Sequence, residues 1–126
     1  MELRKVAAAF VAGCKDGNEL ENLDALYAED AVSIESRGSD ERPRKAFGRD
    51  AIRDKHVWWC ESFETHEIDV KGPFFHCPDR FAVVFRFDAT RLATLRRDVF
   101  EVLAIYTVAE GKIVREEFFS TSQGVL

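Results

Sequence analysis

Apolar residues are most concentrated in the last third of the chain, in three runs separated by short polar stretches. Residues 81–88, 98–108 and 112–119 are rich in β-branched and aromatic side chains and contain no proline, which predicts three long strands. Residues 109–111 are short enough for a hairpin loop, because Gly111 can adopt a positive φ. We therefore expect a run of antiparallel strands at the carboxyl end of the chain.

These predicted strands have two apolar faces. In the first strand, Phe81, Val83, Phe85 and Phe87 alternate with Ala82, Val84, Arg86 and Asp88. The middle strand is apolar on both faces apart from Glu101. A sheet with two apolar faces needs a cover on each, and the predicted helices suffice for only one of them. We therefore expect a homodimer in which a second copy of the chain covers the other face.

The first half of the chain predicts three helices. The first covers residues 3–14 and ends near Gly17, with apolar side chains at amphipathic spacing: Leu3, Val6, Ala7, Phe10 and Cys14. Asn18 begins a second helix, in which Glu21 is placed for a capping box and Tyr27 extends the buried stripe. A third helix starts at residues 48–50, and its buried face is expected to contain Ile52, His56, Trp59 and Phe63.

Two shorter strands complete the expected elements. Residues 31–35 form one that ends at Glu35, and residues 65–71 form a half-exposed one that Gly72 and Pro73 bend. Polar connections are expected at residues 36–45 and 90–97. The order of elements predicts a single α+β domain over residues 1–126, with three amino-terminal helices packed on a strongly curved, mixed, mostly antiparallel sheet.

Composition and charge narrow the possible partners. The net charge of −5 argues against nucleic acid. Residues 36–55 are locally basic, but their charges are mixed, so a solvated loop is favoured over a phosphate site. Three scattered cysteines, Cys14, Cys60 and Cys77, do not form a disulfide framework and favour a reducing cytoplasm. Residues 11–14 imitate a lipoprotein signal, but the helical spacing around them favours a folded helix and no membrane partner.

Three segments resemble the superfamily of nuclear transport factor two, which includes ketosteroid isomerase, scytalone dehydratase and SnoaL-like polyketide cyclases. They are LYAEDAV (26–32), GRDAI (48–52) and IYTVAEGKIV (105–114). The similarity covers nearly the whole chain and implies a cone with an internal pocket between the helices and the concave sheet face. It also implies dimerisation through the convex face. These segments are mostly structural, so they indicate the fold more specifically than the chemistry.

The resemblance carries over to single residues only in part. Glu35 matches the general-base Asp of ketosteroid isomerases, and His56 matches a Tyr of their hydrogen-bond network. Phe10 stands in place of their oxyanion-stabilising Tyr and cannot donate a hydrogen bond. Leu103 or Ala104 replaces their protonated Asp, so steroid isomerisation is not supported. Glu101 matches an acid that SnoaL-like proteins commonly carry on the penultimate strand.

Each candidate residue also has a structural interpretation. A carboxylate at Glu35 would lose water at the cone mouth and become a useful base, but a shift of one residue would point it outward. His56 is either its acid–base partner or a core histidine. Glu101 is costly on an apolar strand unless it reaches a cavity or pairs with Arg86. Glu116 has the same ambiguity.

The first hypothesis is a cofactor-independent acid–base enzyme, an isomerase, cyclase or dehydratase, acting on a hydrophobic small molecule. Its catalytic residues would be Glu35, His56 and Glu101, and its ligand-binding residues Phe10, Trp59, Arg86 and Glu116. The sequence contains no nucleotide loop, metal-ligand cluster or nucleophile elbow, so no cofactor or metal is expected. The alternatives are a non-catalytic ligand-binding module that uses the same pocket, and a dimeric adaptor that works through its convex sheet face.

Overall fold

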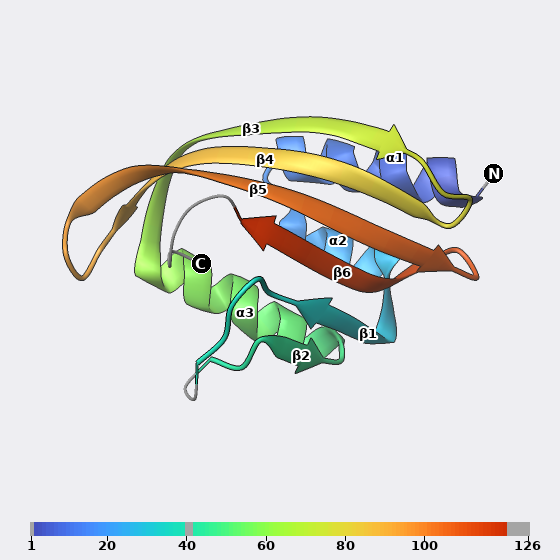
Figure 1. The fold of residues 1–126 in the computed structure, drawn as a ribbon, viewed down its shortest axis with the longest axis horizontal. Coiled ribbons are helices and arrows are strands. Elements are labelled where there is room, and N and C mark those ends of the chain that lie inside the picture. Colours follow the sequence, from blue (N-terminus) through green and yellow to red (C-terminus); the bar gives the residue numbers. More distant parts are fainter. Residues whose placement is uncertain (1, 40–41, 121–126) are drawn as a thin grey trace.

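Helices cover one side of a curved, open sheet (Figure 1). This computed structural model describes residues 2–39 and 42–120, so two residues of the expected loop at 36–45 lie outside the described ranges. The elements run α1 (Glu2–Lys15), α2 (Glu19–Leu26), β1 (Tyr27–Ile34), β2 (Lys45–Phe47), α3 (Arg49–Ser62), β3 (Phe63–Phe75), β4 (Arg80–Arg91), β5 (Arg96–Ala109) and β6 (Lys112–Ser120). The predicted α+β class, with helices packed on a curved mixed sheet, is confirmed.

The strands form one sheet in the order β2-β1-β6-β5-β4-β3. Neighbouring strands are antiparallel except β1 and β6, which run parallel. The three predicted carboxyl-terminal strands are β4, β5 and β6. The first two extend further than expected, because Arg91 and Arg96 still pair across the hairpin. The predicted polar connection at residues 90–97 is therefore reduced to a tight turn between these two arginines.

Several boundaries differ from the sequence prediction. Tyr27 begins β1 directly after α2 ends, so it is a strand residue and not part of the α2 stripe. β2 begins at Lys45, the last residue of the expected loop, and β3 continues past Gly72 with a register shift. Asn18 precedes α2 but makes no side-chain capping bond, because its ψ of 41° departs from the extended backbone that capping requires. The capping box predicted with Glu21 is therefore wrong.

The helices cover the face of the sheet that we call the inner face. Phe81 of β4 lies on it, with its ring 5.0 Å from that of Tyr106 and 5.8 Å from that of Phe10 in α1. Phe10 is thus part of the packed core. Since side chains alternate along a strand, Arg86 and Glu101 lie on the opposite, outer face. Along the described ranges, no helix is both long and apolar enough to cross a bilayer.

α1 and α2 approach closely where Gly13 faces Asn22. The Asn22 side chain is buried and its amide donates a hydrogen bond to the Phe10 carbonyl at 3.0 Å. A Cβ atom added at Gly13 would overlap the Asn22 carboxamide. Glycine is therefore required here by the close approach of the two helices, and the buried amide joins them.

We expect Gly13→Ala to lower the free energy of unfolding by about 1–3 kcal/mol, because the overlap displaces the Asn22 amide from its hydrogen bond. In an Asn22→Ala background the overlap is absent. The same Gly13→Ala change should then raise the free energy of unfolding by about 0.5–1 kcal/mol through helix propensity. Urea unfolding of the four variants measures both values. An equal effect of Gly13→Ala in the two backgrounds would contradict the proposed contact.

Candidate functional site

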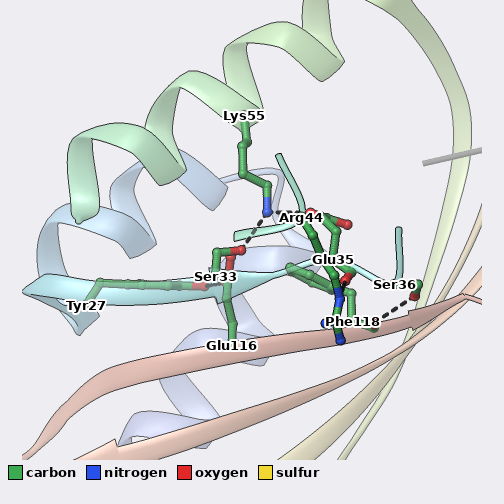
Figure 2. A network of polar contacts seen from close by, with 8 residues as sticks. All are labelled: Tyr27, Ser33, Glu35, Ser36, Arg44, Lys55, Glu116 and Phe118. Carbon is green, nitrogen blue, oxygen red and sulfur yellow. Dashed lines mark hydrogen bonds and ion pairs between the residues drawn. The ribbon is translucent and has the colours of Figure 1, made fainter. Parts of the chain in front are cut away.

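Two groups of polar side chains lie at the inner face of the sheet where β1 and β6 pair, and Lys55 connects one of them to α3 (Figure 2). One contains Ser33, Glu35 and Lys55, and the other contains Tyr27 and Glu116. They are neighbours, because Ser33 on β1 is in register with Glu116 on β6. The parallel pairing of β1 and β6 therefore brings residues from both ends of the chain into one region.

Glu35 directly follows β1, and its backbone is held on two sides. Its N–H donates to the Arg44 carbonyl at 2.8 Å, and the Arg44 Nε–H donates to the Glu35 carbonyl at 2.9 Å. The hydroxyl of Ser36 donates to the Phe118 carbonyl at 2.8 Å, which fastens the same segment to β6. The position of the Glu35 carboxylate is thus fixed by its surroundings as well as by its own rotamer.

Lys55 extends from α3 to meet this carboxylate. Its ammonium forms an ion pair with Glu35 and donates to the Ser33 hydroxyl at 2.6 Å. It also lies 5.2 Å from the centre of the Phe118 ring. The Lys55 and Glu35 side chains are 21% and 17% exposed, so water screens their interaction less than it would at the surface. Each side chain keeps part of its surface in contact with water, and the ion pair holds the two charges next to each other.

The second group is more deeply buried. The Tyr27 hydroxyl donates to a Glu116 carboxylate oxygen, and the two residues are 3% and 2% exposed. Burial raises the pKa of the Tyr27 hydroxyl well above its usual value, and the negative charge of Glu116 raises it further. Tyr27 therefore stays protonated and remains a hydrogen-bond donor to Glu116. This pair lies next to Ser33, which is in register with Glu116 on the neighbouring strand.

The structure brings together two of the residues that the sequence singled out, Glu35 and Glu116. Glu35 pairs with Lys55 and not with His56, the predicted partner. Lys55 and His56 are consecutive residues of α3, so their side chains leave the helix about 100° apart. His56 is half-buried, beside Lys55 in sequence. The geometry thus gives Lys55 the place that the resemblance suggested for His56.

The remaining sequence candidates lie elsewhere. Arg86 and Glu101 face each other across β4 and β5 on the outer face, 3.7 Å apart, with side chains 59% and 50% exposed. They form a surface pair and are not gathered with Glu35. Trp59 stacks on Phe63 at 3.9 Å, within a second aromatic cluster near the carboxyl end of α3. Phe10 is a core residue, as described above.

Sequence reasoning did not identify Lys55, Ser33 or Tyr27 as site residues. Two local signals could have indicated the first two. Lys55 lies three positions after the buried Ile52, on the same side of α3. Ser33 lies two residues before Glu35, so both side chains point to the same side of the extended segment. Tyr27 could not be found in this way, because its partner Glu116 is 89 residues away in the chain.

The arrangement suits proton transfer. A carboxylate can accept a proton, and an adjacent ammonium can stabilise negative charge that develops on an oxygen atom. Within residues 2–39 and 42–120, no group of three His, Cys, Asp or Glu side chains is placed to hold a metal ion. The charged atoms that face each other here are those of Glu35 and Lys55, with the Ser33 hydroxyl beside them.

Comparison with known proteins places this fold in a family. The model of the SnoaL-like domain matches residues 7–116. A structure from Mesorhizobium loti, described as a candidate SnoaL-like polyketide cyclase, is 33% identical and has a TM-score of 0.88; the match covers 94% of this chain and 99% of that one. No curated protein sequence gives a significant match.

More distant structures share the fold alone. A candidate isomerase from Bacillus subtilis is 16% identical with a TM-score of 0.71, over 95% of this chain and 84% of that one. A candidate polyketide cyclase from Xanthomonas campestris is 17% identical with a TM-score of 0.66, over 93% and 88% of the two chains. The family match and the 33% identical structure together show that this chain is a member of the SnoaL-like family.

Proposed function

We propose that this protein is a cofactor-independent acid–base enzyme, an isomerase, cyclase or dehydratase, that acts on a hydrophobic carbonyl compound in a pocket between the helices and the sheet. The observation that carries the proposal is the fixed Glu35–Lys55 pair beside Ser33, held between α3 and the inner sheet face. The names of the related structures, which include polyketide cyclases and isomerases, favour the same class of reaction.

The proposed reaction begins when the Glu35 carboxylate removes a proton from the carbon next to the substrate carbonyl. The electrons of that C–H bond move to the carbonyl oxygen, and the Lys55 ammonium stabilises the resulting enolate. Glu35 then returns the proton to another carbon in an isomerisation. In a cyclisation the enolate carbon attacks a second carbonyl of the same molecule, and the protonated Glu35 gives its proton to the alkoxide that forms. In a dehydration the enolate electrons form a double bond to the next carbon and expel its hydroxyl group, which takes the proton from Glu35 and leaves as water.

Tyr27 and Glu116 act as positioning residues in this proposal. Both are buried, and neither is placed to reach a substrate before Ser33 and Lys55. Their hydrogen bond links the start of β1 to β6, the two strands that carry Ser33 and Phe118. The contribution of the pair is therefore to keep the surface beneath Lys55 in one arrangement.

A deuterium-exchange screen tests the proposal. The protein is incubated in D₂O with hydrophobic ketones, enones and β-keto esters, and incorporation next to the carbonyl is followed by NMR. We expect exchange above the buffer rate for compounds that bind. Binding without exchange would favour the non-catalytic ligand-binding module, and neither binding nor exchange would favour the dimeric adaptor.

We also propose a homodimer formed through the outer, convex face of the sheet. Val84, Leu103 and Phe119 are in register across β4, β5 and β6 and form an apolar row on that face. Leu103 and Phe119 are exposed. A second copy that covered this row would remove its apolar surface from water, which favours association.

Light scattering after size-exclusion chromatography tests the dimer. Leu103→Lys places a charge in the centre of the apolar row, and we expect it to yield a folded monomer because the side chain is exposed in the single chain. Leu95→Lys, at the exposed β4–β5 turn, is the matched control and should leave the dimer intact. A monomeric unmodified protein, or a dimeric Leu103→Lys variant, would contradict this interface.

We also propose that the protein is located in the cytoplasm. Cys14, Cys60 and Cys77 are free thiols in the structure, as expected of a protein from a reducing compartment. Burial raises the pKa of the Cys14 thiol to about 12, so this thiol stays protonated and unreactive at neutral pH.

A further inference from the structure

The described part of the segment between β1 and β2 is attached to α3 at two places. At the start of the segment, Glu35 forms the ion pair with Lys55 described above. Further along, the Arg42 guanidinium lies over the Trp58 ring, 3.3 Å from its centre. Lys55 and Trp58 are three positions apart on α3, so they are neighbours on one side of that helix. The second attachment is therefore close to the candidate base.

A short and stiff backbone path connects Arg42 with Glu35. The Glu35 N–H donates to the Arg44 carbonyl at 2.8 Å, and the Arg44 Nε–H donates to the Glu35 carbonyl at 2.9 Å. Pro43, whose ring fixes φ, is the single residue between Arg42 and Arg44. A Cβ atom added at Gly38 would overlap the Arg44 backbone, so the two sides of the segment pack directly against each other. A displacement of Arg42 would therefore move the backbone that holds Glu35.

Few other contacts hold this segment against the helix. Arg42 is half-buried, whereas residues 36–39, 43 and 44 are exposed. Trp58 is itself held in place, because its ring contacts the buried Phe63 edge to face with the ring centres 5.9 Å apart. Partial burial lowers the pKa of the Arg42 guanidinium, the negative charge of Glu35 opposes that change, and the positive charge of Arg91 adds to it. A segment with so little buried surface depends strongly on each contact that it makes.

We propose that Arg42 and Trp58 are positioning residues for Glu35. Their stack fixes the segment on α3, so that the Glu35 carboxylate stays against Lys55 in the place from which it accepts the substrate proton. Neither Arg42 nor Trp58 contacts the substrate. Without the stack, the segment has one attachment fewer and Glu35 spends more time away from Lys55. The effect on catalysis rests on the proposed function; the coupling between the stack and the ion pair does not.

NMR of the Lys55 ammonium group tests the coupling on the full chain without any substrate. Among the lysines that the structure describes, Lys55 alone is not exposed, so its ion-paired ammonium should exchange protons with water more slowly than the others. Lys55→Met identifies its signal. We expect Arg42→Gln and Trp58→Leu each to accelerate this proton exchange by about threefold to tenfold, as the loss of one cation–π contact allows. Arg37→Gln, which changes an exposed arginine of the same segment, is the matched control and should leave the rate unchanged.

Conservative variants separate this role from a loss of folding, which circular dichroism checks. Arg42→Lys keeps a cation and Trp58→Phe keeps a ring, so each should restore most of the slow ammonium exchange. The double variant Arg42→Gln/Trp58→Leu should exchange no faster than the faster single variant, because both changes remove the same contact. An unchanged rate in Arg42→Gln, or effects of the two changes that multiply in the double variant, would overturn the proposal. If Arg42→Gln does not fold, the comparison of Trp58→Leu with Trp58→Phe decides in the same way.

Deuterium exchange into accepted substrates measures the consequence for catalysis. We expect Arg42→Gln to lower the rate at saturating substrate by about threefold to tenfold and to leave KM nearly unchanged, because the base is displaced while the pocket is intact. Faster ammonium exchange in Arg42→Gln, with no catalysis by the unmodified protein, would leave the coupling standing and remove the proposed function. Catalysis that Arg42→Gln does not slow would leave the acid–base enzyme standing and overturn the positioning role.

Discussion

Replacing Glu35 by Gln is expected to slow deuterium exchange into accepted substrates by about 100- to 10,000-fold, the range that general-base catalysis contributes. The amide has nearly the size of the carboxylate and retains the backbone contacts to Arg44. It cannot accept the substrate proton. Exchange rates at saturating substrate, with folding checked by circular dichroism, measure the loss. Lys55→Met should also slow exchange, because the enolate would lose its neighbouring cation.

The matched control is Glu117→Gln. Glu117 is on β6 next to Glu116 in sequence, but it lies on the outer face and contacts Arg115. Its replacement should leave exchange unchanged. The same assay on Glu101→Gln and His56→Gln tests the sequence hypothesis, in which both residues are catalytic. The structure does not place Glu101 near Glu35, so Glu101→Gln should leave exchange unchanged. Full activity of Glu35→Gln would remove Glu35 from the mechanism.

Alkaline titration should show no tyrosinate absorbance until the protein unfolds. The chain has two tyrosines, Tyr27 and Tyr106, and both are buried. Burial raises the pKa of each hydroxyl well above its usual value, and the charge of Glu116 raises both further. Both rings should therefore stay protonated in the folded protein and ionise together on unfolding, which the absorbance at the tyrosinate band records.

The same groups determine how stability depends on pH. The pKa values of Tyr27, Tyr106 and the Cys14 thiol are raised by folding, so the unfolded chain releases protons that the folded chain retains. Their contribution is fully present below about pH 8, where the unfolded thiol and phenols are still protonated, and is lost as the pH rises. Ordinary thiol and tyrosine pKa values predict a free energy of unfolding roughly 5 kcal/mol lower at pH 11 than at pH 8.

Urea unfolding at several pH values measures this slope. Cys14→Ala should make it shallower between pH 9 and pH 10, where the unfolded thiol ionises before the phenols do. Tyr106→Phe should halve the tyrosinate signal that appears on unfolding. A gradual tyrosinate signal near pH 10, with circular dichroism still native, would show that one of the rings is accessible to water.

Sequence predicted the elements whose pattern is local. Strands β4 to β6 follow from their β-branched and aromatic residues, and α1 follows from the spacing that buries Phe10 and Cys14. The beginning of β1 was missed because no loop separates it from α2, so Tyr27 continued the helical pattern of Leu23 and Leu26. A boundary between a helix and a strand that contains no turn residues gives no local sequence signal of its position.

The candidate site was predicted less completely than the fold. The alternation of side chains left open whether Glu35 points toward the helices or outward, and in the structure it pairs with Lys55 of α3. The choice of Lys55 over His56 depends on the reach of a lysine side chain across the space to β1, which periodicity does not describe. The position of Glu116 depends on the parallel register of β1 and β6, which is set by the whole sheet.

That parallel register has a consequence for the order of folding. The hydrogen bond between Tyr27 and Glu116 closes a loop of 89 residues, and every residue of α3, β3, β4 and β5 lies within that loop. Closing so long a segment costs chain entropy before any contact compensates for it, and proteins with such high contact order fold slowly. The buried acid Glu116 therefore joins the base and its lysine only when β1 and β6 meet. A chain that ends before β6 would contain Glu35 and Lys55 but would lack the strand against which they are positioned.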